Sequence, residues 1–144
     1  MDEKTRNQVV VHYKDGSVLK GFTHDFTPLK NTFHLNVEMG PQAGEVRDVL
    51  VAELKAIFFV KSFEGNRTYV EKKLFEQVND ARLRGLKIRV EFKDGEVVRG
   101  ISLGYSKGKR GFFLIPIDPE CNNDRIYVLA DACNKIQVGD LAKV

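Results

Sequence analysis

Residues 13–21 read Tyr-Lys-Asp-Gly-Ser-Val-Leu-Lys-Gly, and residues 92–100 read Phe-Lys-Asp-Gly-Glu-Val-Val-Arg-Gly. The second stretch is a copy of the first. In each copy, apolar and polar residues alternate on both sides of an Asp-Gly pair, which is the pattern of a β-hairpin with a tight primed turn. Glycine supplies the positive φ that such a turn requires. We predict a structural role at these turns for Asp15, Gly16, Gly21, Asp94, Gly95 and Gly100.

The duplication extends well beyond the hairpins. The same offset aligns Phe33 with Phe112 and Leu35 with Leu114, so a whole unit is repeated. In each unit, runs of alternating apolar residues predict five short strands. In the first unit the predicted strands are residues 9–13, 18–26, 32–37, 46–52 and 54–63. In the second unit they are residues 87–93, 96–105, 111–117, 126–130 and 135–138.

Five short strands per unit favour a small closed barrel, because closure removes the exposed edges of a sheet. The expected fold is therefore mainly β, with two tandem five-stranded barrels. We place the first barrel at residues 8–64, a linker at 65–86 and the second barrel at 87–140. Units this small bury modest cores, so we expect them to pack on each other or on neighbouring chains.

The stretch between the two units departs from the β pattern. Thr68 and Glu71 have the spacing of an N-terminal capping box, and Gly85 suits the end of a helix. A single apolar stripe at helical spacing consists of Val70, Leu74, Val78 and Ala81. We predict one amphipathic helix over about residues 69–84, which joins the barrels and covers part of their surface.

The composition of the 144 residues is that of an ordinary globular chain. The formal net charge is +3, and acidic residues are mixed with basic ones throughout. This balance is compatible with nucleic acid but is far from a basic tail. Cys121 and Cys133 have no metal-ligand spacing, so we expect free thiols in a reducing compartment. No apolar run reaches the length of a membrane span, and residues 1–4 are not a signal peptide, so we expect a cytoplasmic protein.

The hairpin, the predicted helix and the predicted barrels together resemble the Sm-like family. Its first motif has a turn glycine, a second glycine five residues on, then an aromatic or apolar residue, an Asp and an Asn. The matching residues in the first unit are Gly16, Gly21, Phe26 and Asn31, and those in the second are Gly95, Gly100 and Tyr105. The resemblance implies small barrels and binding of RNA at the loop before the third strand.

This chain departs from the family at the positions that read RNA. In the family, an Asp and an Asn hold a base, and an Arg-Gly pair stacks on it. Thr27 stands in place of the Asp, and the Arg-Gly pairs are replaced by Glu53-Leu54 and Ala132-Cys133. An acid at the position of a cationic stacking partner repels phosphate. The resemblance of the fold is therefore stronger than the resemblance of the activity.

A second resemblance rests on the Phe-Lys-Asp-Gly hairpins and on residues 58–65, which read Phe-Phe-Val-Lys-Ser-Phe-Glu-Gly. These features are similar to an uncharacterised bacterial group, some of whose members accompany signalling domains such as PilZ. The arginine-rich signature of PilZ is absent from this chain, so its ligand is not implied.

Catalytic and metal-binding patterns are missing from the sequence. His12, His24 and His34 all fall on the polar sides of predicted strands, and a metal site needs three or four convergent ligands. The turn geometry fully explains Asp15 and Asp94. No nucleophile elbow, phosphate loop or Cys/His pairing occurs. We therefore expect no enzymatic activity, no cofactor and no metal.

The most polar feature is the run of residues 107–111, Lys-Gly-Lys-Arg-Gly. Backbone N–H groups and cations of such a run suit a phosphate, and Tyr105 could stack on a base. The alternative is a solvated turn that is charged for solubility. The candidate residues for nucleic-acid or anion binding are Thr27, Lys30, Asn31, Tyr105, Lys107, Lys109 and Arg110.

Comparison of the two copies reveals an asymmetry in outward-facing positions. Phe113 and Ile115 stand where the first unit has His34 and Asn36, and Phe58 stands where the second unit has Gln137. A strand that is apolar on both faces is covered on both faces. The cover could be the other barrel, the helix or another chain. We therefore treat Phe58, Phe113 and Ile115 as candidate interface residues.

Two classes of non-enzymatic function remain open. The first is a regulatory or protein-interaction module, which contacts a protein partner or a second copy of itself through apolar strand faces. The second is an RNA- or nucleotide-binding protein that uses the loop face at residues 27–31 and 105–111. The resemblance favours RNA, and the lost Arg-Gly pairs and the balanced charge favour protein interaction.

Overall fold

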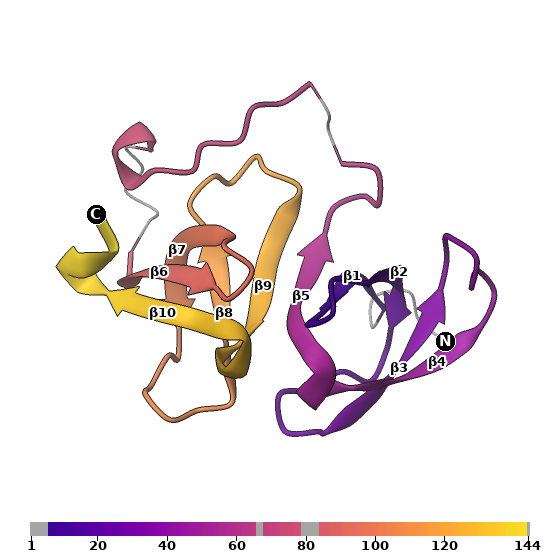
Figure 1. Cartoon of the computed structure of the whole chain (residues 1–144). Coiled ribbons are helices and arrows are strands. Elements are labelled where there is room, and N and C mark those ends of the chain that lie inside the picture. The colour runs from indigo at the N-terminus through magenta and orange to yellow at the C-terminus, as the bar shows by residue number, and fades with distance from the viewer. Residues whose placement is uncertain (1–5, 66–67, 79–83, 144) are drawn as a thin grey trace.

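The computed structural model describes residues 6–65, 68–78 and 84–143. Its ten strands form one open antiparallel sheet with the order β10-β6-β7-β8-β9-β5-β1-β2-β3-β4 (Figure 1). The strands of the first half are β1 (Asn7–Tyr13), β2 (Val18–Thr23), β3 (Thr32–Val37), β4 (Val46–Leu50) and β5 (Leu54–Val60). Those of the second half are β6 (Leu86–Phe92), β7 (Val97–Leu103), β8 (Gly111–Pro116), β9 (Asn123–Leu129) and β10 (Cys133–Val138). Short 3₁₀ turns are η2 (Val51–Glu53), η3 (Phe75–Gln77), η4 (Ala130–Ala132) and η5 (Gly139–Lys143).

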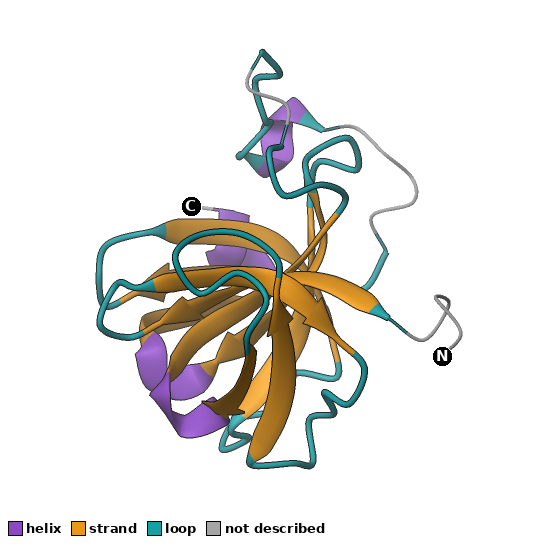
Figure 2. Cartoon of the chain, turned by 90° about the vertical axis from the view of Figure 1, so that its right-hand side faces the viewer, coloured by secondary structure: helices purple, strands orange, loops and turns teal. Residues whose placement is uncertain are grey.

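The prediction of a mainly β protein is confirmed, but the prediction of two five-stranded barrels is wrong. The strand order within each half is the same, because β5-β1-β2-β3-β4 repeats as β10-β6-β7-β8-β9. However, β5 pairs with β9 of the other half, with Ile57 opposite Tyr127 and Phe58 opposite Ile126. This seam merges the halves into one strongly curved sheet (Figure 2), and it leaves β4 and β10 as open edges. Strand-pairing partners are a long-range choice that local alternation does not specify.

Two hydrophobic cores lie on either side of the seam, and each takes residues from both halves. The first-half core includes Phe33 and Leu35, and the second-half core includes Phe112 and Leu114. Residues that cross into the core of the other half are Val10, Ala56, Phe58, Val60, Tyr127 and Leu129. Because β5 and residues 126–129 of β9 are buried on both faces, the two halves form one packed body.

The two Asp-Gly hairpins form as predicted in outline, with φ of 93° at Gly16 and 96° at Gly95. The loop is longer than a two-residue primed turn, because Tyr13 N donates to Ser17 O across three residues. This is the three-residue hairpin loop, which also requires a positive φ at its last position. Asp15 Oδ1 accepts from Ser17 N at 2.8 Å, so the carboxylate stabilises the turn.

Gly21 and Gly100 are structural, but they lie within strands rather than in turns. A Cβ atom at Gly21 would lie 2.2 Å from the carbonyl oxygen of Asn36, and one at Gly100 would lie 2.2 Å from that of Ile115. At both positions the neighbouring strand passes too close for any side chain. The repeated glycine five residues after the turn is thus explained by close backbone approach.

The predicted helix over 69–84 is wrong for the residues that the structure describes, which contain no α-helix; residues 79–83, with Ala81, lie outside them. Residues 68–78 instead form an irregular segment, which we call the strap (Figure 1). Val70 of the predicted stripe is 85% exposed, and Leu74 is 37% exposed. A lone helix without a surface to pack on is marginal in water, so the stripe contributes no covering face.

Asp118 holds the strap in place. This carboxylate is 2% exposed and accepts from Tyr69 Oη at 2.6 Å and from Lys72 N at 2.8 Å. Burial opposes its charge, but these hydrogen bonds outweigh burial and keep the pKa of Asp118 below its usual value. The same contact raises the pKa of Tyr69 to about 12. The strap is therefore fixed across one end of the second half.

Candidate functional site

The two loops predicted to bind nucleic acid are brought together by Arg110. Its Nη1 donates to Asn31 Oδ1 at 2.7 Å, and its Nη2 donates to the carbonyl oxygens of Pro28 and Lys30 at 2.7 Å each. Asn31 and Arg110 are equivalent positions of the duplication, 79 residues apart. The guanidinium thus clasps the first half to the second. These three acceptors occupy the guanidinium of Arg110. Two residues that were predicted to bind nucleic acid, Arg110 and Asn31, are therefore hydrogen-bonded to each other in this structure.

The other predicted nucleic-acid residues are only partly available at this surface. Tyr105 is half-buried, and its ring packs edge-on against Phe112 at 5.0 Å between centroids. Lys109 Nζ donates to the carbonyl oxygen of Gly104 at 3.1 Å. Thr27, Lys30 and Lys107 are exposed. The loop face consequently offers lysines, while its aromatic ring is engaged in packing.

An ion-pair cluster at the seam was not anticipated from the sequence. Lys55 of β5 has only 11% of its side chain exposed, and its Nζ lies 2.7 Å from Asp94 Oδ2 and 2.5 Å from Glu96 Oε1. Burial disfavours the charged lysine, but the two carboxylates outweigh burial and raise the pKa of Lys55. The hydrogen bond from Lys55 lowers the pKa of Asp94. Asp94 therefore shapes its turn and also ties the hairpin to the first half.

The three histidines lie in different environments. His34 Nδ1 lies 2.6 Å from Asp25 Oδ2, and its Nε2 lies 3.2 Å from Asp48 Oδ1, so the hydrogen bond to Asp25 raises the pKa of His34. His12 packs 4.4 Å from the Phe58 ring, and burial lowers its pKa. His24 is exposed. Within residues 6–65, 68–78 and 84–143, no group of three His, Cys, Asp or Glu side chains could hold a metal ion.

The predicted interface residues have different surroundings. Phe58 is 7% exposed and packs in the second-half core, as expected for a ring covered by the other half. Phe113 is half-buried, with its ring 5.0 Å from Tyr127 and 6.0 Å from Phe59. Ile115 remains 38% exposed. The cover of both rings is internal, and Val70 and Leu74 of the predicted helix stripe do not supply it.

An apolar surface patch on the outer face of β7 and β8 consists of Leu103, Phe113 and Ile115, and we call it the β7–β8 patch. Leu103 pairs directly with Phe113 in the ladder, and Ile115 lies two residues further along β8 on the same face. Leu103 is 55% exposed and Ile115 is 38% exposed. The sequence analysis did not identify Leu103 as a surface residue of interest. The repeat offset aligns it with His24, so comparison of the two copies could have revealed this apolar position.

The described residues form an all-β protein with an apolar surface patch and charged clusters. None of their groups of His, Cys, Asp or Glu side chains could hold a metal ion. Over residues 5–139 the chain matches the family of unknown function DUF6982, and it belongs to that family. No curated protein and no solved structure matches the chain. Where the structure describes the chain, none of its helices is long and apolar enough to cross a membrane.

Proposed function

We propose that this protein is a non-enzymatic regulatory or protein-interaction module of the cytoplasm, which contacts a protein partner through the β7–β8 patch. The observation that carries the proposal is the exposure of two large apolar side chains, Leu103 and Ile115, which are diagonal neighbours on one sheet face. Apolar side chains that gather on an exposed face are typical of surfaces that bind a partner.

The duplication supplies an internal comparison for this face. The positions that correspond to Leu103, Phe113 and Ile115 in the first half are His24, His34 and Asn36, and all three are exposed. The ladder is also equivalent, because Phe22 pairs with Asn36 as Ile101 pairs with Ile115. The same sheet geometry thus tolerates polar residues, so folding alone does not require Leu103 and Ile115 to be apolar.

The test is a capture experiment with the double variant Leu103→His and Ile115→Asn, which introduces the residues of the first half. Burying the exposed parts of both side chains against a partner is worth about 2 kcal/mol, so the variant should bind roughly 30-fold more weakly. The tagged protein is used to capture partners from the cytosol of the source cells with and without nuclease. Leu29→His is the matched control, because Leu29 is 94% exposed on a different surface.

A protein that is retained after nuclease treatment, held by the Leu29→His control and lost with the double variant would support the proposal. Its affinity is then measured with the purified partner. Retention of every partner by the double variant would contradict the proposal, as would loss of all captured proteins on nuclease treatment.

Binding of RNA remains the second candidate, because the two loops that bear Lys30 and Lys107 lie together at the Arg110 clasp. The resemblance to the Sm-like family supports this candidate as well. Its test is a titration with single-stranded RNA at several salt concentrations. Lys107→Ala with Lys30→Ala should reduce the salt dependence by about one or two ions if the loop face binds phosphate. Absence of binding at low salt would exclude this function.

A further inference from the structure

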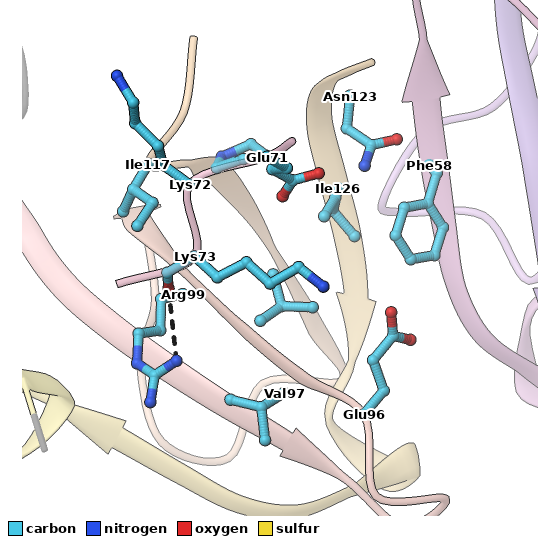
Figure 3. Close-up of a pocket in the computed structure, with 12 residues that line it drawn as sticks. Phe58, Glu71, Lys72, Lys73, Glu96, Val97, Arg99, Ile117, Asn123 and Ile126 are labelled. Atoms are coloured by element: carbon cyan, nitrogen blue, oxygen red, sulfur yellow. Dashed lines mark hydrogen bonds between the residues drawn. The ribbon is translucent and has the colours of Figure 1, made fainter. Parts of the chain in front are cut away.

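A cavity of about 320 Å³ lies between the strap and the second half, next to the seam. Figure 3 shows that its walls come from the strap, from β7, from β9 and from Phe58 on β5 of the first half. The volume falls within the range of sites that bind small molecules. Because Asp118 fixes the strap through Tyr69 and Lys72, the structure holds this cavity open with its walls in place.

One side of the cavity is apolar. Phe58 and Ile126 face each other across the β5–β9 seam, and Ile117 and Val97 extend the wall. Phe58 is 7% exposed and Ile126 is 1% exposed, so the two side chains form a fixed surface. An aromatic or aliphatic group of a ligand would lose its contact with water against this wall.

The other side of the cavity carries an excess of positive charge. Lys72, Lys73 and Arg99 line it together with two carboxylates, Glu71 and Glu96. Glu96 also pairs with Lys55 at 2.5 Å, and Lys55 is shared with Asp94, so the three cations that line the cavity exceed its two carboxylates by one charge. Burial raises the pKa of the Glu71 carboxyl, and the charge of Lys73 opposes that shift.

Lys73 is the cation best placed to meet a ligand. Its side chain reaches across the cavity from the strap in the direction of Phe58 (Figure 3). Within the described part of the chain, its ammonium has no ion-pair partner. The backbone of Lys73 is fixed, since its carbonyl oxygen accepts from Arg99 Nη1 at 3.4 Å and its N–H donates to Gln77 Oε1 at 3.0 Å.

Positive charge also accumulates behind the cavity. Arg99 stands directly opposite Arg89 in the β6–β7 ladder, so two guanidinium groups share one face. Burial and the charge of Arg89 together lower the pKa of Arg99. Arg89 Nε is buried without a hydrogen-bond partner in the described structure. Arg89 Nη2 lies 3.8 Å from Glu91 Oε1, so this carboxylate balances part of the charge.

We propose that the cavity beneath the strap binds a small amphipathic anion, in which an apolar ring or chain rests on Phe58 and Ile126 and one acidic group pairs with Lys73. A carboxylate, a sulfonate and a phosphate monoester share this chemistry. The enclosing strap selects small molecules over polymers, and the apolar wall selects against simple inorganic ions. This site is separate from the β7–β8 patch, and its test does not depend on that proposal.

The test uses 1-anilino-8-naphthalenesulfonate, an aromatic anion that fluoresces when it leaves water, with the folded full-length chain. N-phenyl-1-naphthylamine is the matched neutral probe, because it has the same rings without the sulfonate. Lys73→Gln should weaken sulfonate binding by roughly fivefold or more, since a charged hydrogen bond is lost. Glu71→Gln should strengthen it. Lys135→Gln, which removes the same charge from the exposed face of β10, should change it less than about twofold.

The expected result is one sulfonate probe per chain, with opposite effects of the Lys73 and Glu71 variants, and binding of the neutral probe that Lys73→Gln does not change. Circular dichroism of each variant checks that the fold is retained. Absence of a single saturable site would overturn the proposal. Equal weakening by Lys73→Gln and Lys135→Gln, or equal sensitivity of both probes to Lys73→Gln, would overturn it as well.

Discussion

The seam between the halves can be tested at Phe58, which stands where the second half has Gln137. We predict that Phe58→Gln destabilises the whole chain, because the side chain is 7% exposed and packs against Ile126 and the ring of His12. Loss of the buried ring costs about 1.5–3 kcal/mol, and a buried amide without a partner costs about 1–3 kcal/mol more. The expected loss of unfolding free energy is therefore about 2.5–6 kcal/mol.

Urea denaturation monitored by circular dichroism measures this loss, since the chain has no tryptophan for fluorescence. For an m-value of about 1.5 kcal/mol/M, the midpoint should fall by about 2–4 M urea. Phe75→Gln is the matched control, because Phe75 is half-buried on the strap, away from the seam. Its expected cost is below about 1 kcal/mol.

The cover over Phe58 is internal, so the midpoint of Phe58→Gln should be the same at low and high protein concentration. A concentration-dependent midpoint would mean that a second chain covers the ring. A loss no larger than that of Phe75→Gln would refute the packing argument itself. In either case the shared cores would no longer explain why the two halves differ at this position.

Three further expectations follow from single contacts. Gly100→Ala should destabilise the chain more than Gly95→Ala, because its Cβ would lie 2.2 Å from a carbonyl oxygen while Gly95 has open space; urea denaturation compares them. Lys55→Met should lower the unfolding free energy near neutral pH, because its ion pair with Asp94 is lost. The difference in unfolding free energy between the variant and wild type should shrink as pH falls below about 4, since Asp94, with its lowered pKa, adds stability only while its carboxylate is charged. His34 should titrate above 6.5 in NMR, since Asp25 raises its pKa, so its contribution to stability is present below 6.5 and is lost as pH rises through the folded value. A Gly95→Ala cost equal to that of Gly100→Ala, an unchanged Lys55→Met difference in acid, or a His34 pKa below 6.5 would contradict these expectations.

The strands and hairpins could be predicted from the sequence because their signals are local. Alternation of apolar residues and the Asp-Gly pairs specify each strand without knowledge of its neighbours. Whether the second edge of β5 closes onto β4 of its own half or pairs with β9 is decided by contacts far along the chain. The predicted barrels were therefore a plausible outcome of local rules that the long-range pairing overturned.

The path of the strap and the hydrogen bonds of Arg110 likewise could not be predicted from local sequence patterns. Thr68 and Glu71 have the spacing of a helix start, but Asp118, 46 residues beyond Lys72, takes the backbone N–H of Lys72. The sequence indicated Asn31 and Arg110 as candidate nucleic-acid-binding residues. Their hydrogen bond to each other depends on how the halves pack. Residues whose partners lie in the other half could be identified as candidates from the sequence, while their roles required the structure.

The duplication places equivalent residues in different surroundings. Several positions that one half covers are apolar, while their equivalents at the edges of the sheet are polar. Where one half covers the other, the residues are apolar, as for Phe58 on β5 and Tyr127 on β9. At the open ends of the sheet, the equivalent residues are Gln137 on β10 and Asp48 on β4, and Asp48 is exposed. Charged side chains such as Asp48 on β4 and Lys135 on β10 oppose further pairing at the two edges, although Val46 and Leu50 on β4 are exposed as well.

The β7–β8 patch differs from the equivalent face of the first half, and this difference is why we propose that a partner binds it. Leu103 and Ile115 are apolar, yet no described element covers them, since they remain 55% and 38% exposed. Their counterparts in the first half, His24 and Asn36, are polar. Exposed apolar side chains also occur elsewhere, as at Leu29 and Val70, but Leu103 and Ile115 share one sheet face with Phe113 and have polar counterparts in the first half. We therefore propose that contact with another protein buries these side chains.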